Sequence, residues 1–91
     1  MKNAKQIERH FKGIANHRRI EIMLLLAGEA NLSLETIAKR LDVNFQTLAE
    51  HTRRLYSAGL INKNYHGREV HHSLSPYGKK FVSFLHAVQK F

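Results

Sequence analysis

The first predicted helix has one narrow apolar edge. Its apolar residues are spaced three, four and three positions apart: Ala4, Ile7, Phe11 and Ile14. This is the spacing of a helix that packs along a seam, as helices do at an interface. The segment 4–14 is therefore expected to form an interface helix.

A second predicted helix begins after Asn16, whose side chain is a favoured N-cap. Apolar residues surround almost its whole circumference: Ile20, Ile22, Met23, Leu24, Leu25, Leu26 and Ala27. A helix that is apolar on every side belongs at the centre of a fold. We expect it to end at Gly28, because glycine adopts the left-handed conformation of many helix C-termini without steric cost.

Two short helices follow, joined by a sharp turn. Ser33 is an N-cap for the first of them. Its apolar residues repeat at helical spacing: Leu34, Ile37, Ala38 and Leu41. The pattern is then interrupted, and Asn44 is the N-cap of the next helix, which runs to about Ala58 with Leu48 and Leu55 facing inward.

From Leu60 onward the pattern changes to the two-residue period of a strand. His66–Gly67 is the predicted hairpin turn, because glycine accepts a positive φ. One strand face then carries Ile61, Lys63, Tyr65, Arg68, Val70, His72 and Leu74. The opposite face carries Asn62, Asn64, Glu69, His71 and Ser73.

The last predicted helix starts with Ser75 as N-cap and Pro76 at its first position. Its apolar residues form a wide aromatic stripe: Tyr77, Phe81, Phe84, Leu85, Val88 and Phe91. A stripe this wide needs a partner surface. We interpret it as the core of a dimer rather than as a ligand pocket.

Length and composition limit the classes of function. The 91 residues correspond to one domain, 1–91, and cysteine is absent, which excludes a disulfide or a thiolate zinc site. No spacing resembles a nucleophile elbow, a phosphate loop or a paired-carboxylate site, so neither an enzyme nor a cofactor is predicted. The longest apolar run, 22–27, is too short to cross a bilayer. Because no hydrophobic targeting segment is evident either, a cytoplasmic protein without a membrane partner is expected.

The charge balance favours a polyanionic partner. Lysine and arginine outnumber aspartate and glutamate by 15 to 7, for a formal net charge of +8. The excess is uneven, since residues 1–20 contain six basic and one acidic residue, and residues 44–72 contain four and two. We interpret a group of N-terminal cations as a solvated basic face: Lys2, Lys5, Arg9 and Lys12.

The seven histidines do not form a pattern typical of metal binding. His71 and His72 are adjacent on a strand and point to opposite faces, so they cannot share one ion. A pair made by His10 of one subunit and His86 of another lacks further ligands. No metal site is predicted, and His72 is interpreted as an inward-facing histidine bonded to a backbone group.

The order of helix, turn, helix and hairpin is that of a winged helix-turn-helix, mainly α with a small β-hairpin wing and about five helices. Over nearly its whole length the sequence resembles the ArsR-type winged helix-turn-helix repressors. The resemblance rests on Asn16–Met23, Leu34–Leu41, Thr47–His51, Leu55, Ala58–Ile61 and Gly67–Val70. The junction Leu74–Lys79 is also similar to that of MarR-like and HxlR-like regulators.

This resemblance implies a homodimeric, sequence-specific regulator of transcription, of the repressor type, that binds double-stranded DNA. The helix 44–58 would enter the major groove, and the wing 62–73 would lie on flanking backbone or in the minor groove. The dimer would form through the first and last helices, at Ala4, Ile7, Phe11, Phe81, Phe84, Leu85 and Val88. An architectural or protein-interaction winged helix with little sequence specificity is the alternative, and no small-molecule effector is identified.

Candidate contacts divide between bases and phosphates. Base edges are assigned to the start of the fourth helix: Phe45, Gln46, Thr47, Ala49 and Glu50. Backbone or wing contacts are assigned to His51, Arg53, Arg54, Lys63, His66 and Arg68. Thr52 and Arg54 stand where such helices more often have aliphatic residues, and Glu50 stands where a basic or small residue is more usual. Glu50 would repel a phosphate but would accept a hydrogen bond from cytosine.

Overall fold

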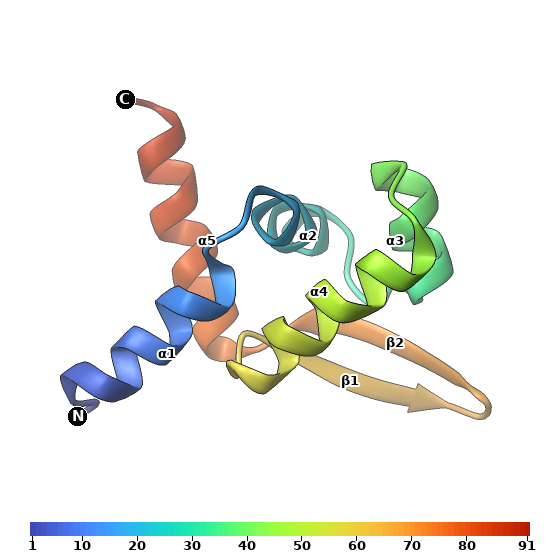
Figure 1. Cartoon of the computed structure of the whole chain (residues 1–91), viewed down its shortest axis with the longest axis horizontal. Helices are drawn as coiled ribbons and strands as arrows, with labels where there is room; N and C mark the ends of the chain where they lie inside the picture. Colours follow the sequence, from blue (N-terminus) through green and yellow to red (C-terminus); the bar gives the residue numbers. More distant parts are fainter.

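A computed structural model describes residues 1–91 as five helices and one antiparallel hairpin. The elements are α1 (Ala4–Ile14), α2 (His17–Gly28), α3 (Leu34–Leu41), α4 (Phe45–Ser57), β1 (Ile61–His66), β2 (Glu69–Leu74) and α5 (Pro76–Gln89). The hairpin projects from one end of the molecule, and α1 and α5 lie at the other end (Figure 1). The predicted winged helix-turn-helix, mainly α with a β-hairpin wing, is confirmed.

Polar side chains begin the helices by accepting hydrogen bonds from first-turn N–H groups that have no partner within the helix. The four predicted N-caps are confirmed: Asn16, Ser33, Asn44 and Ser75. At the start of α1, Asn3 and Gln6 form a reciprocal capping box, with both side chain to backbone distances at 2.9 Å. Helix starts are therefore specified locally.

The turn between α3 and α4 is tight because Asp42 adopts the left-handed conformation, with φ of 53°. Its N–H donates to the carbonyls of Ala38 and Lys39, which closes the last turn of α3. Aspartate is one of the few residues besides glycine that visit this region routinely. The chain therefore reverses and restarts at Asn44 without a glycine.

The hairpin has the predicted two faces, since Ile61 pairs with Leu74, Lys63 with His72 and Tyr65 with Val70. The predicted turn position is wrong by one residue. Strand pairing extends to His66 and Glu69, so the turn consists of Gly67 and Arg68. Gly67 has φ of +64°, as the first central residue of a II′-type turn requires. Arg68 therefore lies at the tip and not on a strand face.

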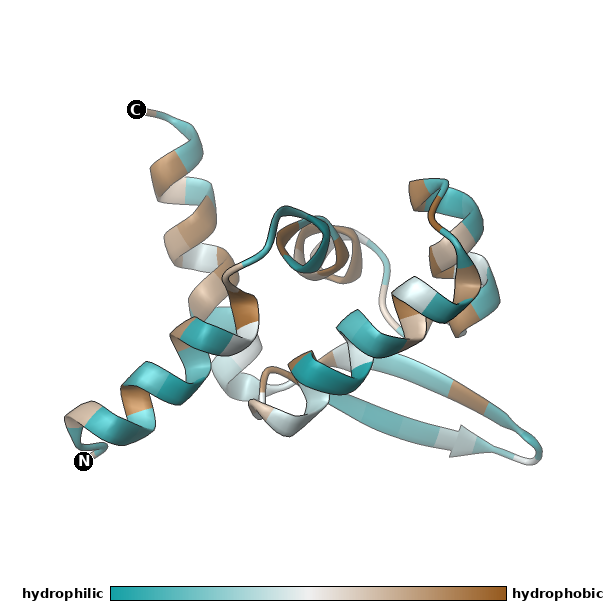
Figure 2. Ribbon diagram, in the orientation of Figure 1, coloured by the Kyte–Doolittle hydropathy of each residue, from teal (hydrophilic) through white to brown (hydrophobic).

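Helix α2 is the central element of the core. Its Ile22 and Met23 are completely buried, and α1, α3, α4, α5 and β2 all pack against it. In Figure 2 the hydrophobic turns of α2 lie in the middle of the molecule, as its all-round apolar pattern predicts. The other completely buried large side chains are Ile37, Leu48, Leu55, Leu60 and Ile61.

The predicted end of α2 is wrong in its geometry. Gly28 is the last helical residue and does not have a positive φ, and Glu29 follows in an extended conformation. The left-handed residue is Asn31, with φ of 60°. The chain must run extended here because Leu32 forms a two-way backbone bridge with His72. Ala27, placed on the apolar surface of α2 by its sequence, is exposed.

Gly78 provides a test of the packing between α5 and the start of the wing. A Cβ atom at Gly78 would overlap the backbone carbonyl of Leu60, which cannot move aside as a side chain can. Gly78→Ala is expected to lower the free energy of unfolding by about 1–3 kcal/mol, measured by urea denaturation at fixed protein concentration.

Gly28→Ala is the matched control, since nothing lies within 4 Å of its added Cβ atom and its backbone is helical. This variant should be neutral or gain up to about 1 kcal/mol. Equal stability of the two variants would contradict the close approach of α5 to Leu60.

Candidate nucleic-acid interface

Helix α4 has one face in the core and one face exposed. Leu48, Thr52 and Leu55 form the buried face, which sets the rotation of the helix about its axis. Of the residues assigned to base contacts, four are exposed and one, Ala49, is half-buried. The four exposed residues are Phe45, Gln46, Thr47 and Glu50. We refer to these four exposed side chains as the ridge, which spreads over roughly half of the circumference of α4 because successive helical residues differ by about 100° in direction.

Glu50 is engaged with two arginines of its own helix. Its carboxylate accepts from Arg53 Nε at 3.0 Å and Nη2 at 2.6 Å, and from Arg54 Nε at 3.0 Å. These guanidinium groups lower the pKa of Glu50 to about 2 through their hydrogen bonds and charges, and Arg53 has the larger effect. The carboxylate is therefore ionised across the physiological range and holds both arginines along the helix.

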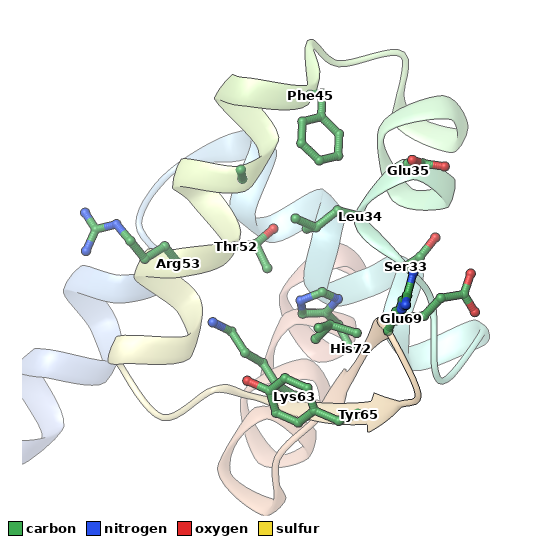
Figure 3. Close-up of a pocket in the computed structure, with 13 residues that line it drawn as sticks. Ser33, Leu34, Glu35, Phe45, Thr52, Arg53, Lys63, Tyr65, Glu69 and His72 are labelled. Atoms are coloured by element: carbon green, nitrogen blue, oxygen red, sulfur yellow. The ribbon is translucent and has the colours of Figure 1, made fainter.

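A groove of about 430 Å³ separates α4 from the wing. Figure 3 shows Phe45 and Thr52 on the α4 side, Lys63 and Tyr65 on the strands, and His72 at the floor. Arg53 lines the outer edge of the groove, and its guanidinium group points away from the wing. The predicted reading helix and the predicted wing contacts therefore border one concave surface.

The cations of the wing differ in how firmly they are held. Lys63 is half-buried, and its Nζ lies 4.4 Å from the ring centroid of Tyr56, a cation–π contact that draws it toward α4. Arg68 is exposed at the tip and forms no hydrogen bond or salt bridge. His66 stacks on His71 with a centroid distance of 4.5 Å. Arg68 is therefore the most accessible cation of the wing.

His51 is turned toward α2 rather than outward. Its Nδ1 accepts from Arg19 Nε at 3.2 Å, and burial, followed by the charge of Arg19, lowers the pKa of His51. This geometry favours a neutral imidazole that positions a guanidinium group. Thr52, at a position where an aliphatic residue is more usual, is buried and satisfies its hydroxyl by donating to the Leu48 carbonyl at 2.8 Å.

His72 is buried beneath the groove, as predicted, and its Nδ1 donates to the Leu32 carbonyl at 3.1 Å. Burial lowers its pKa, an effect only partly opposed by this backbone hydrogen bond. The histidine therefore joins β2 to the segment between α2 and α3.

Helices α1 and α5 meet near Phe11 and Phe81 and diverge toward the chain termini, and their apolar residues remain largely uncovered (Figure 1). Phe11 and Phe81 form an edge-to-face pair with a centroid distance of 5.1 Å. The residues of this seam that are exposed are Ile7, Phe11, Tyr77, Phe84, Val88 and Phe91, while Phe81 and Leu85 are half-buried. We refer to these residues together as the apolar face, which lies on α1 and α5 at the end of the molecule opposite the wing (Figure 1).

His10 is a structural residue that the sequence interpretation missed. Its Nδ1 donates to the Ala58 carbonyl at 2.6 Å, and its ring stacks on Tyr77 with a centroid distance of 5.2 Å. It therefore ties α1 to the end of α4 and to α5. The spacing to Ile7 and Ile14, three and four positions away, could have identified it as a buried residue.

No three histidine, aspartate or glutamate side chains converge closely enough to hold a metal ion. None of the helices has the length and apolar character that a bilayer-spanning segment requires.

Comparison with known proteins yields structural rather than sequence matches. No family model and no curated protein matches the sequence. HlyU from Vibrio cholerae superposes with a TM-score of 0.85 at 28% identity, covering 96% of this chain and 95% of HlyU. A homodimeric winged helix-turn-helix DNA-binding domain from Mycobacterium bovis, a possible ArsR-family transcriptional regulator, superposes with a TM-score of 0.85 at 25% identity. The match covers 94% of this chain and 80% of that domain.

A more distant match supports the same fold. The transcriptional repressor PagR of Bacillus anthracis superposes with a TM-score of 0.81 at 20% identity, covering 89% of this chain and 93% of PagR. The resemblance to ArsR-type winged helix-turn-helix regulators, inferred from scattered residues, is therefore confirmed in three dimensions.

The buried His72 predicts that stability depends on pH. An unfolded chain protonates this residue near its ordinary pKa of 6.5, whereas the folded chain does so only at lower pH. The unfolded state therefore binds more protons as the pH falls through 6.5, and the free energy of unfolding decreases. Urea denaturation at pH 7.5 and about pH 5.5 should show this loss.

Two substitutions test whether His72 causes this pH dependence of the unfolding free energy. His72→Gln should reduce the difference in unfolding free energy between the two pH values. His86→Gln, at an exposed position on α5, should keep the wild-type difference. A wild-type pH dependence in the His72→Gln protein would contradict the assignment.

Proposed function

We propose that this chain is a homodimeric, sequence-specific DNA-binding regulator of transcription, of the repressor type. Helix α4 inserts its exposed ridge into the major groove, and the wing contacts flanking backbone or the minor groove. The observation that carries the proposal is the position of this ridge: it projects beside the wing while the opposite face of α4 anchors it in the core. The whole chain, 1–91, acts as a single domain.

The side chains of the ridge suit contact with base edges, and the cations around them suit contact with backbone phosphates. Gln46 is exposed and is able to form two hydrogen bonds with adenine, while Phe45 and Ala49 suit contact with a thymine methyl group. Arg68 and Lys63 of the wing, together with Arg53 and Arg54 of α4, are the cations for phosphates. His51 and His66 remain proposed backbone contacts. Glu50 remains a proposed base contact, and its carboxylate must first break the ion pairs with Arg53 and Arg54.

The dimer is proposed to form through the apolar face of α1 and α5. Its members are Ala4, Ile7, Phe11, Phe81, Phe84, Leu85 and Val88. Exposure of this many large apolar side chains on two neighbouring helices is unfavourable in water. The homodimeric state of the structurally similar Mycobacterium bovis domain supports a homodimer for this chain, and the choice of α1 and α5 rests on their exposed apolar residues. Two reading helices then face successive major grooves, which favours a roughly palindromic site.

The alternative function is an architectural winged helix that binds DNA with little sequence preference. The pairing of Glu50 with Arg53 and Arg54 favours it, because that pairing engages one of the side chains assigned to base contact. Neither proposed function requires catalysis or a cofactor. In both, the partner is double-stranded DNA and the proposed location is the cytoplasm.

Selection of bound duplexes from a random pool separates the two functions. At near-physiological salt, the regulator should enrich a defined two-fold symmetric sequence, whereas the architectural protein should enrich only A·T content. Gln46→Ala is expected to relax the preference at one position per half-site, at a cost of about 1–3 kcal/mol against the selected base. An equal loss of affinity for all duplexes would contradict base readout by Gln46.

Phe84 tests the proposed dimer, because it is 54% exposed in the single chain and lies in the middle of the α5 stripe. Phe84→Asp should convert a dimer to a monomer in solution mass measurements, since the dimer would have to bury an unpaired carboxylate. The matched control is Ser83→Asp, the exposed residue before it. A Phe84→Asp protein that remains a dimer would place the interface elsewhere.

A further inference from the structure

Helix α4 is bordered on the side away from the wing by a second concave surface. A cleft of about 230 Å³ lies where α1, α2 and α4 meet, and five of its lining side chains are cationic: Arg9, Lys12, Arg19, Arg53 and Arg54. No acidic residue lines it. We refer to this surface as the basic cleft.

The carboxylates nearby do not neutralise the basic cleft. Glu50 pairs with Arg53 and Arg54. The Oε1 atom of Glu8 lies 3.8 Å from Lys12 Nζ, and because both side chains are exposed, water screens this ion pair strongly. Arg9 and Arg19 form no salt bridge with any residue of the chain. The cleft therefore carries an excess of positive charge.

Arg19 is held in place by neutral groups alone. Its Nη1 donates to the carbonyls of Lys12 and Gly13 at 3.3 and 3.0 Å, and its Nε donates to His51. These bonds use three of the five guanidinium N–H groups and leave the two on Nη2 without a partner. Burial and the positive charge of Arg54 lower the pKa of Arg19. An anion in the cleft would complete these interactions and reduce this repulsion.

The position of the basic cleft matches the shape of a duplex. The major groove is ~12 Å wide, so a helix inserted in it has a sugar–phosphate strand along each flank. The wing and its groove lie along one flank of α4, and the basic cleft lies along the other, with Arg53 lining both. Resting on the proposed function, we propose that the basic cleft binds a backbone phosphate of the strand opposite the one that faces the wing.

The proposed dimer places this contact along the operator. Helix α1 contributes to both the cleft and the proposed interface, whereas the wing points away from that interface (Figure 1). The phosphates bound by the cleft therefore lie between the two half-sites, and those bound by the wing lie outside them. Arg9 and Lys12 thus have a role in DNA binding beyond that of solvated surface charge.

The test removes two cleft charges and compares the result with an equal loss elsewhere. The variant is Arg9→Gln with Lys12→Gln, and the control is Lys5→Gln with Lys90→Gln, two exposed lysines outside the cleft. Affinity for the selected duplex is measured over a range of salt concentrations, with dimerisation and folding of each variant checked by solution mass and circular dichroism.

If each protomer loses one or two phosphate contacts, the slope of log K against log salt should decrease in magnitude by roughly 2 to 4 per dimer. The affinity should fall equally for preferred and mismatched duplexes, because phosphates carry no sequence information. The control should keep a slope close to that of the wild type.

Phosphate ethylation interference locates the contact. In the cleft variant, sensitivity should disappear at phosphates between the half-sites and persist at the outer phosphates. Arg68→Gln should give the opposite pattern. A cleft variant that matches the control in slope and interference pattern would overturn the inference while leaving the proposed function intact. A wild-type protein that binds no duplex would overturn both.

A free phosphate ligand is separated from DNA by one further measurement. Inorganic pyrophosphate is added to the wild type and to the cleft variant, and the shift in melting temperature is recorded. A shift that is lost in the variant, together with control-like duplex binding, would mean that the cleft serves a free anion and would overturn the assignment to DNA.

Discussion

The burial of α2 on all sides is the constraint on which the rest of the structure depends. Its apolar circumference must be covered, and α1, α3, α4, α5 and β2 each cover part of it. Once Leu48 and Leu55 are used to cover α2, the rotation of α4 is set, because adjacent helical residues differ by about 100° in direction. The ridge of α4 is therefore exposed as a consequence of how the core is completed.

The electrostatics of the surface follow from the same packing. Segment by segment, the largest charge excess belongs to residues 1–20, far along the chain from the reading helix. Folding brings α1 against the end of α4, where His10 bonds to Ala58 and Gly13 packs closely on the same residue. Arg9 and Lys12 consequently lie beside Arg54, and the basic region around α4 is larger than its own sequence indicates.

The reading helix is also electrostatically restrained. Glu50 draws Arg53 and Arg54 along the helix axis, so two cations that a linear sequence assigns to phosphates have an internal partner in the free chain. If these arginines bind phosphates of a duplex, each exchanges the Glu50 carboxylate for a phosphate group. Such an exchange favours sites where additional contacts compensate for the broken pairs.

The accuracy of the sequence-based predictions depends on the range of the interactions involved. Caps at Asn16, Ser33, Asn44 and Ser75 were predictable because each involves groups within a few residues. The geometry after Gly28 was not, because a bridge between Leu32 and His72, 40 positions apart, extends the chain there. The hairpin faces were predictable from a two-residue period, but its turn depended on how far strand pairing continued.

The sequence by itself determined the order of the elements, the buried sides of the helices and the predominance of positive charge, since periodicity, capping and composition are local or additive properties. The tertiary structure alone decided which distant residues share a surface. It brought α1 and α5 together at Phe11 and Phe81, buried His10 against Ala58, and placed Arg9, Lys12 and Arg19 around the flank of α4. The physical reason is that these neighbours are selected by packing around α2, which no single segment encodes.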